Sequence, residues 1–271
     1  MERLIEWLGG EAQVWHLVRV GVLVAARVAP LTLFAPWLSM RTSPPILRAA
    51  VILALTVVLT PLAAESVQTV PVGGLNLALL AVKEALVGAV FAVASALPLH
   101  ALTWAGRLTD TWRGASMAEI VAPHTGERSS PLGELYLLMG IAIFVALGGH
   151  RLAIAAFAEG LAQVPVGAAS VGGAISDVAL GATRLSANAL AFATALAAPA
   201  AAAIILVEVS LGLLARTAPQ IPVFFAGMPL RAATGVAAAL LGLSILVGEL
   251  PTAYRDAIDA AAQLLMPFSS R

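Results

Sequence analysis

LLARTAPQIPVFFAGMPLRAATG, residues 213–235, lies between two long apolar stretches of the chain. It contains three prolines, two adjacent phenylalanines and two arginines. Proline cannot extend a helix from its interior, but it suits the first helical turn. The stretch therefore predicts the tip of a helical hairpin, with Pro229 at the start of the second helix.

A second stretch of the same kind lies near the N-terminus. ARVAP (residues 26–30) resembles ARTAP (residues 215–219), and each is followed by a Phe-Ala pair. PILRAA (residues 45–50) then resembles PLRAA (residues 229–233). The order of the matches predicts two hairpins of one design, joining helices one and two and helices five and six. Proline, glycine and arginine are also common in turns between helices, so the similarity can arise without a structural correspondence between the two hairpins.

The composition indicates a membrane protein. Of 271 residues, 60% are hydrophobic and only 11% are charged, whereas soluble domains are about one-quarter charged. Too few charges remain to cover a water-facing surface, so a polytopic membrane protein is the expected class. The formal net charge is zero and there is no basic run, so no nucleic-acid partner is expected. Cysteine is absent, which excludes disulfides and thiol nucleophiles.

Long windows without charge divide the chain into six predicted helices. A membrane span needs about 20 apolar residues, and flanking charged side chains can extend towards the interface. The predicted fold is all-α, with helical segments at residues 12–38, 45–64, 75–115, 131–162, 174–218 and 228–265. Pro98 and Pro199 fall inside the third and fifth segments, where proline is expected to kink a helix.

The sequence offers little that supports catalysis. Its four histidines form no metal-ligand pair of the HExxH type. Neither a G-x-S-x-G nucleophile elbow nor a Walker A glycine loop is present. We therefore expect no enzyme, no cofactor and no metal site.

Isolated charges within the apolar segments need a partner or water. Glu208 lies in AAAIILVEVSLGLL, and Arg216 follows on the same helical face but too far along to touch it. Pairing with another subunit is the preferred interpretation, because no second acid lies at a useful spacing for a proton relay. Arg19, Glu84 and Glu159 are further candidates for intersubunit charge contacts, although snorkelling also explains Arg19.

Three stretches together resemble one known family. They are the hairpin sequence quoted above, RVAPLTLFAPWLSMRTSPPILRAAVILALTVVLTP, and ALTWAGRLTDTWRGASMAEIVAPHTGERSSPLGELYLLMGIAIFVALGGHRLAI. By this combination the chain is identified as a member of the FliR/SctT family of flagellar and type III secretion export gates, through most of residues 15–250. GRLTDTWRG (residues 106–114) is more similar to the injectisome branch, SctT. Val121-Ala122-Pro123 departs from the family pattern, which has an acid before the proline.

The resemblance implies a place in the bacterial inner membrane. Such proteins occur as one copy with several SctR/FliP-like and SctS/FliQ-like subunits around an export channel, and an SctU/FlhB-like subunit wraps the entrance. The implied role is structural: part of the channel wall for unfolded exported proteins. A single helical domain is expected over residues 1–271, with a first hairpin at 12–64, middle helices at 75–162 including a loop at 112–130, and a last hairpin at 174–265.

The resemblance also implies that the loop after the third helix helps to plug the closed channel. This loop maps onto Trp112–Gly126, and the candidate gating residues are Trp112, Arg113, Gly114, Ser116, Met117 and Pro123. Gly and Ser supply backbone freedom, and Met supplies an apolar contact that can repack. An ordinary interhelical connector explains the same residues.

The tip of the last hairpin carries Phe224, Phe225 and Met228. A ring of apolar side chains can gate a pore by excluding water. The same side chains can instead pack against a partner helix, and we favour packing.

Three other interpretations fit part of the pattern. A flagellar gate protein of the FliR branch is the alternative within the family. A small-molecule or ion transporter shares the repeated hairpins and Pro-interrupted helices, but its repeat should be inverted or cover half of the chain. A multispan membrane enzyme would need a cluster of polar catalytic residues, which the sequence does not show.

Overall fold

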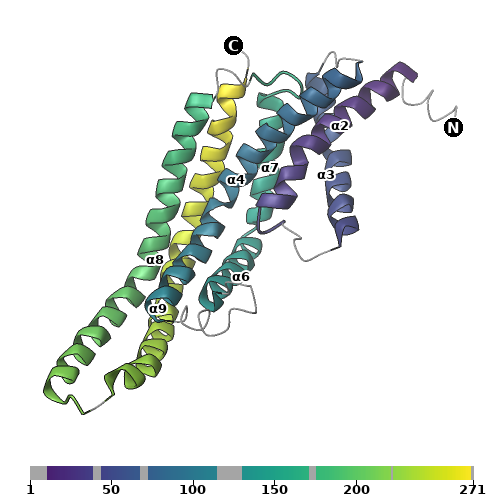
Figure 1. Cartoon of the computed structure of the whole chain (residues 1–271). Helices are drawn as coiled ribbons and strands as arrows, with labels where there is room; N and C mark the ends of the chain where they lie inside the picture. The colour runs from purple at the N-terminus through teal and green to yellow at the C-terminus, as the bar shows by residue number, and fades with distance from the viewer. Residues whose placement is uncertain are drawn as a thin grey trace. The chain divides into compact units, whose positions relative to one another are not determined.

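The computed structural model describes residues 11–38, 44–67, 73–114, 130–170, 175–220 and 222–269 (Figure 1). Within these residues every regular element is a helix and there is no strand, which confirms the predicted all-α class. The elements are α2 (Glu11–Phe34), α3 (Pro45–Ser66), α4 (Gly74–Trp112), α6 (Pro131–Ala146), α7 (Gly149–Gln163), α8 (Ile175–Thr217), α9 (Val223–Leu265) and a 3-10 helix, η2 (Met266–Phe268). In the described part of the chain, five helices are long and apolar enough to cross a membrane, or six spans are present if α6 and α7 together form one.

Two of the predicted helix starts are marked by proline. Pro45 occupies the first turn of α3, and Pro131 occupies the first turn of α6. The prediction that Pro229 begins the last helix is wrong, because α9 begins at Val223 and Pro229 lies inside it. Pro222 is the proline at this helix start: its carbonyl accepts hydrogen bonds from Phe225 N and Ala226 N at 3.0 and 3.2 Å.

The predicted fourth segment, residues 131–162, consists of two helices. Gly148 has a φ of 74°, in the left-handed region, and it separates α6 from α7. Glycine adopts this conformation without the steric cost that a side chain adds. By contrast, α4 and α8 continue as helices through Pro98 and Pro199, and a kink at these residues stays a prediction.

The chain divides into two compact units, and α4, α8 and α9 contribute to both. The first unit comprises Met1–Ala96, Gly148–Leu185 and Arg255–Arg271. The second comprises Leu97–Leu147 and Ser186–Tyr254. The expected single domain over the whole chain stays a prediction.

In the first unit, α2 packs against α3, and α3 also contacts α7. The backbones of α2 and α4 approach so closely that a Cβ atom on Gly88 would lie 2.0 Å from the carbonyl oxygen of Arg27. Phe91 of α4 meets Phe157 of α7 edge to face, with ring centroids 5.3 Å apart. Close backbone contact at glycine is typical of helix packing in membranes, where burial from water does not drive association.

In the second unit, α6 packs against both α4 and α9. A Cβ atom on Gly106 would lie 2.2 Å from the backbone nitrogen of Gly133, so α4 and α6 touch through their backbones. Tyr136 of α6 is buried, and its hydroxyl donates to the carbonyl of Ala239 on α9 at 2.8 Å. These contacts fix α6 between the two longer helices.

Candidate functional site

A fully buried ion pair lies in the first unit, between Arg27 of α2 and Glu84 of α4. Arg27 Nε donates to Glu84 Oε2 at 2.5 Å, and Arg27 Nη2 also contacts this oxygen. Arg27 Nη1 donates to the carbonyl of Val164 at 2.7 Å, and Gly167 N donates to Glu84 Oε1 at 2.8 Å. We call these four residues the buried ion-pair cluster. It joins α2, α4 and the turn after α7, with the two charges neutralising each other.

Two adjacent residues of α4, Lys83 and Glu84, form hydrogen bonds to the turn after α7. Besides the bond to Glu84, the carbonyl of Gly167 accepts a hydrogen bond from Lys83 Nζ at 3.2 Å. Gly167 has a φ of 88°, which favours glycine at this position. Both backbone polar groups of this residue are therefore satisfied by side chains of α4.

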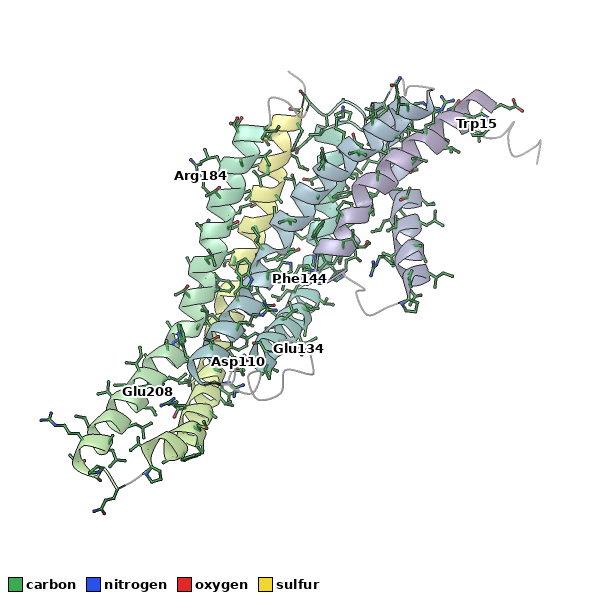
Figure 2. All side chains as sticks on the ribbon, in the orientation of Figure 1. Trp15, Asp110, Glu134, Phe144, Arg184 and Glu208 are labelled. Atoms are coloured by element: carbon green, nitrogen blue, oxygen red, sulfur yellow. The ribbon has the colours of Figure 1, made fainter. Side chains whose placement is uncertain are left out.

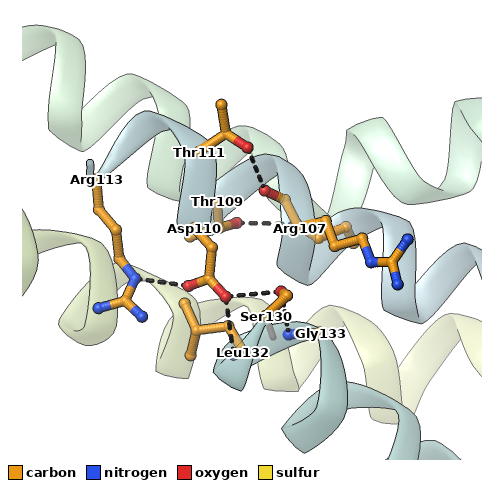
Figure 3. Close-up of polar contacts among 9 residues, drawn as sticks. Arg107, Thr109, Asp110, Thr111, Arg113, Ser130, Leu132 and Gly133 are labelled. Carbon is orange, nitrogen blue, oxygen red and sulfur yellow. Dashed lines mark hydrogen bonds and ion pairs between the residues drawn. The ribbon is translucent and has the colours of Figure 1, made fainter. Parts of the chain in front are cut away.

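A second polar cluster, in the second unit, joins the end of α4 to the start of α6 (Figure 3). Asp110 Oδ1 accepts from Arg113 Nε at 2.6 Å. Asp110 Oδ2 accepts from Ser130 Oγ at 2.7 Å and from Leu132 N at 3.1 Å. Ser130 Oγ in turn accepts from Gly133 N at 3.1 Å. We call these five residues the Asp110 joint.

The Asp110 joint satisfies the first free N–H groups of α6. A helix leaves its first N–H groups without partners inside the helix. Pro131 has no N–H, the N–H of Leu132 bonds to Asp110, and the N–H of Gly133 bonds to the N-cap residue Ser130. A negative charge at a helix N-terminus also interacts favourably with the helix dipole. The carboxylate is thus matched to α6 by hydrogen bonding and by charge.

A third ion pair joins α8 and α9 in the second unit. Its acid, Glu208, is labelled on α8 in Figure 2. Arg231 Nε lies 2.7 Å from Glu208 Oε1, and Arg231 Nη2 donates to Glu208 Oε2 at 3.1 Å. The side chains are 26% and 45% exposed for Arg231 and Glu208. Glu208, which was predicted to pair with another subunit, is thus paired with an arginine of its own chain.

The structure describes only part of the predicted plug loop. Trp112 ends α4 with 39% of its surface exposed, Arg113 belongs to the Asp110 joint, and Gly114 has a φ of 81°. Ser116, Met117 and Pro123 lie outside the described residues. The plugging role of all six residues stays a prediction.

The residues predicted at the last hairpin tip all belong to α9. Phe225 is 72% exposed and Met228 is 41% exposed, so both side chains have surface available to a partner. The side chain of Phe224 lies outside the described part of the chain. Packing against a partner helix stays a prediction.

The remaining charge candidates differ in their surroundings. Glu84, expected as an intersubunit contact, is instead fully buried and paired with Arg27 of the same chain. Arg19 is half-buried, whereas Glu159 and Arg216 are exposed. Among the described residues, none of these three forms an ion pair, and their intersubunit contacts stay predictions.

Three important polar residues were not predicted as site residues: Arg27, Asp110 and Ser130. Arg27 could have been identified as a charge within an apolar segment that needs an acidic partner. Ser130 directly precedes Pro131, a pattern typical of an N-cap followed by a first-turn proline. Within the described residues, no group of three or more His, Asp or Glu is placed to hold a metal ion.

The fold and these clusters define an all-helical, multi-pass membrane protein whose buried polar groups connect helices. The chain belongs to the family of bacterial export proteins, family 1, whose sequence model matches residues 18–257. This finding confirms the FliR/SctT resemblance. Members of this family are structural components of an export apparatus, so the protein is a component of such an apparatus.

Relatives from both branches of the family are similar to this chain. Flagellar biosynthetic protein FliR of Caulobacter vibrioides is 26% identical over 244 residues, 89% of this chain and 95% of that protein. FliR of Bacillus subtilis is 27% identical over 187 residues, 69% of this chain and 72% of that protein. Yop proteins translocation protein T of Yersinia pestis is 32% identical over 190 residues, 69% of this chain and 71% of that protein.

Proposed function

We propose that this chain forms part of the channel wall in a type III export gate, through which unfolded proteins leave the cell. Membership of the bacterial export proteins supports this role, as do relatives named for flagellar biosynthesis and Yop translocation. We place it in the bacterial inner membrane, in a hetero-oligomer with SctR/FliP-like, SctS/FliQ-like and SctU/FlhB-like subunits. The injectisome branch is our choice, and the flagellar branch is the alternative.

The length of the last hairpin is the observation that best supports a multi-chain wall. Helices α8 and α9 each contain 43 residues. At 1.5 Å per residue each extends about 65 Å, roughly twice the hydrocarbon thickness of a bilayer. Large apolar side chains are nevertheless exposed over most of this length, from Ile175 and Leu180 to Ile205, Leu206 and Leu213 on α8, and from Phe225 to Val247 on α9. One bilayer cannot cover this surface, so partner proteins are needed.

The paired acids argue against an ion-coupled transporter. Such transporters need acidic groups that converge near the middle of the membrane and can exchange an ion. Glu84, Asp110 and Glu208 are each paired with an arginine of the same chain. Their charges are already balanced, which favours a structural role.

Purification tests the proposed assembly. The chain should be isolated from membranes that also express its neighbouring genes, and the mass of the particle should be measured. A defined hetero-oligomer containing small hydrophobic subunits is the expected result. A stable homodimer that takes up a solute in vesicles would contradict the gate and favour the transporter.

We propose further that residues 112–126 help to plug the closed channel. Deletion of Ser116–Gly126 should raise the small-ion conductance of the assembled complex, because the segment that blocks the pore is shortened. Replacing residues 116–126 with a Gly/Ser segment of equal length is the control for loop length. Unchanged conductance of both variants in an assembled complex would reject the plug.

A further inference from the structure

We propose that Asp110 is a positioning residue, which fixes the points where the chain leaves α4 and enters α6 and so sets the base of the channel-closing loop. The proposal rests on the plug role given above for residues 112–126, but it concerns only the described residues at the two ends. Its basis is the Asp110 joint, in which one carboxylate binds partners on both sides of the connecting segment.

The burial of Asp110 makes this connection specific. Its side chain is 7% exposed, and its two oxygens accept from Arg113, Ser130 and Leu132. Hydrogen bonds to an ionised carboxylate are stronger than those between neutral groups. Loss of the carboxylate would leave the buried Leu132 N–H without its partner, which carries a further cost.

The position of Asp110 near the end of α4 indicates that its charge stabilises α6 and not α4. It lies in the last turn of α4, where the helix dipole disfavours a negative charge. Arg113, three residues later, offsets that cost through its ion pair. At the N-terminus of α6 the same charge is favourable, so the net benefit of an acid here arises from the helix that follows.

The helices around the joint leave little freedom for another arrangement. The backbone contact between Gly106 and Gly133 sets the distance between α4 and α6. A Cβ atom on Gly235 of α9 would lie 3.0 Å from the Cβ of Arg113, so the arginine packs tightly on α9. Asp110 therefore provides the polar connection between α4 and α6 at a point where α4, α6 and α9 are closely packed.

The Asp110 joint fixes Arg113 and Ser130, the described residues on either side of the proposed plug segment. We expect that Asp110→Ala frees the start of α6 and the last turn of α4, and that the closed complex then leaks. Roughly tenfold higher small-ion conductance is expected, which corresponds to about 1.4 kcal/mol. Asp110→Asn should give a smaller increase, because an amide oxygen still accepts one of the bonds but the ion pair with Arg113 is lost.

Thr111→Ala is the matched control. Thr111 is the exposed neighbour of Asp110, and its hydroxyl donates only to the carbonyl of Arg107 in its own helix, at 2.8 Å. This variant should assemble and conduct like the unsubstituted complex. Equal conductance of Asp110→Ala and Thr111→Ala, in complexes with the same subunits, would overturn the proposal.

A reversible crosslink keeps the test valid if Asp110→Ala fails to assemble. The chain contains no cysteine, so the pair Asp110→Cys with Ser130→Cys can form a single intramolecular disulfide. The complex with the reduced pair should show raised small-ion conductance. Oxidation should restore the low conductance, because the disulfide replaces the hydrogen bond between Asp110 and Ser130 with a covalent bond. A leak that persists after the disulfide has formed would overturn the proposal.

The crosslink also separates this proposal from the plug. Formation of the disulfide reports the joint itself, whatever the segment between its ends does. If deletion of Ser116–Gly126 leaves the conductance unchanged while the disulfide forms, the plug is rejected and the joint stands as a structural connection. If the deletion leaks but the oxidised pair conducts as much as the reduced pair, the plug stands and the role of Asp110 is rejected.

Discussion

The Arg27–Glu84 and Arg231–Glu208 pairs use the same two residue types in very different surroundings. The first pair is 2% and 0% exposed, and the second is 26% and 45% exposed. Breaking a buried pair leaves a charge without compensation, whereas exposed pairs contribute little because water and salt screen them. Loss of the buried pair should therefore destabilise the first unit more than loss of the exposed pair destabilises the second.

The repeated turn sequence illustrates the same point. In the repeat, Arg27 corresponds to Arg216, yet Arg27 is buried in an ion pair and Arg216 is exposed. Pro45 starts α3, whereas its counterpart Pro229 lies inside α9. Similar turn residues thus predicted two hairpins but did not predict the surroundings of their charges.

The largest effect is expected from Glu84→Ala. Arg27 would remain buried without its counter-ion, and the bond from Gly167 N would also be lost. Removing one partner of a buried pair typically costs about 3–5 kcal/mol. Thermal unfolding of the purified complex, together with the amount of folded protein recovered, measures this loss.

Asp259→Ala is the control for Glu84→Ala, because Asp259 is an exposed acid of the first unit. A double change, Arg27→Met with Glu84→Leu, removes both charges and should recover much of the stability lost in the single variant. Equal stability of Glu84→Ala and Asp259→Ala would show that the buried pair is not important for the first unit.

Gly88→Ala should have the next largest effect. The new Cβ would lie 2.0 Å from the carbonyl oxygen of Arg27, so α2 and α4 would have to separate around the ion pair. Overpacking of this kind typically costs about 1–3 kcal/mol. The measurement is again the unfolding temperature of the purified complex.

Gly212→Ala is the matched control for Gly88→Ala. Gly212 lies inside α8, and a Cβ atom there would meet nothing within 4 Å. Alanine is favoured over glycine in a helix interior by up to about 1 kcal/mol. A loss of stability equal to that of Gly88→Ala would contradict the explanation based on helix contact.

The smallest effect is expected from Glu208→Gln. Exposed ion pairs contribute about 0–1 kcal/mol, and glutamine retains the shape of glutamate and its ability to accept a hydrogen bond from Arg231. The stability difference should shrink further at high salt, because salt screens the exposed charges. A loss as large as that of Glu84→Ala would indicate that partner chains bury this pair in the assembly.

Charge-free windows predicted most of the fold, because a helix in lipid must be both long and apolar. The break at Gly148 was missed, since a glycine pair within an apolar run does not by itself distinguish a continuous helix from two helices. The start of α9 was placed too late because Pro222 and Pro229 both suit a first turn.

The candidate site was predictable only in part. The sequence showed that Glu84 and Glu208 need partners, but Arg27 lies 57 residues from Glu84, and helix periodicity does not relate residues in different helices. Asp110 stood out only within a family pattern. Its partners Ser130 and Leu132 lie 20 and 22 residues further along the chain, and helix periodicity does not relate them to a residue of α4.

The separation of the buried ion-pair cluster along the chain has a consequence during protein synthesis. Arg27 emerges 57 residues before Glu84 and 137 residues before Val164. At translation rates of about 5–20 residues per second, Arg27 waits roughly 3–11 s for its counter-ion and about 7–27 s for the carbonyl. An arginine within an inserting helix costs up to about 2.5–3.5 kcal/mol, so α2 carries this unfavourable charge until α4 supplies Glu84 as its counter-ion.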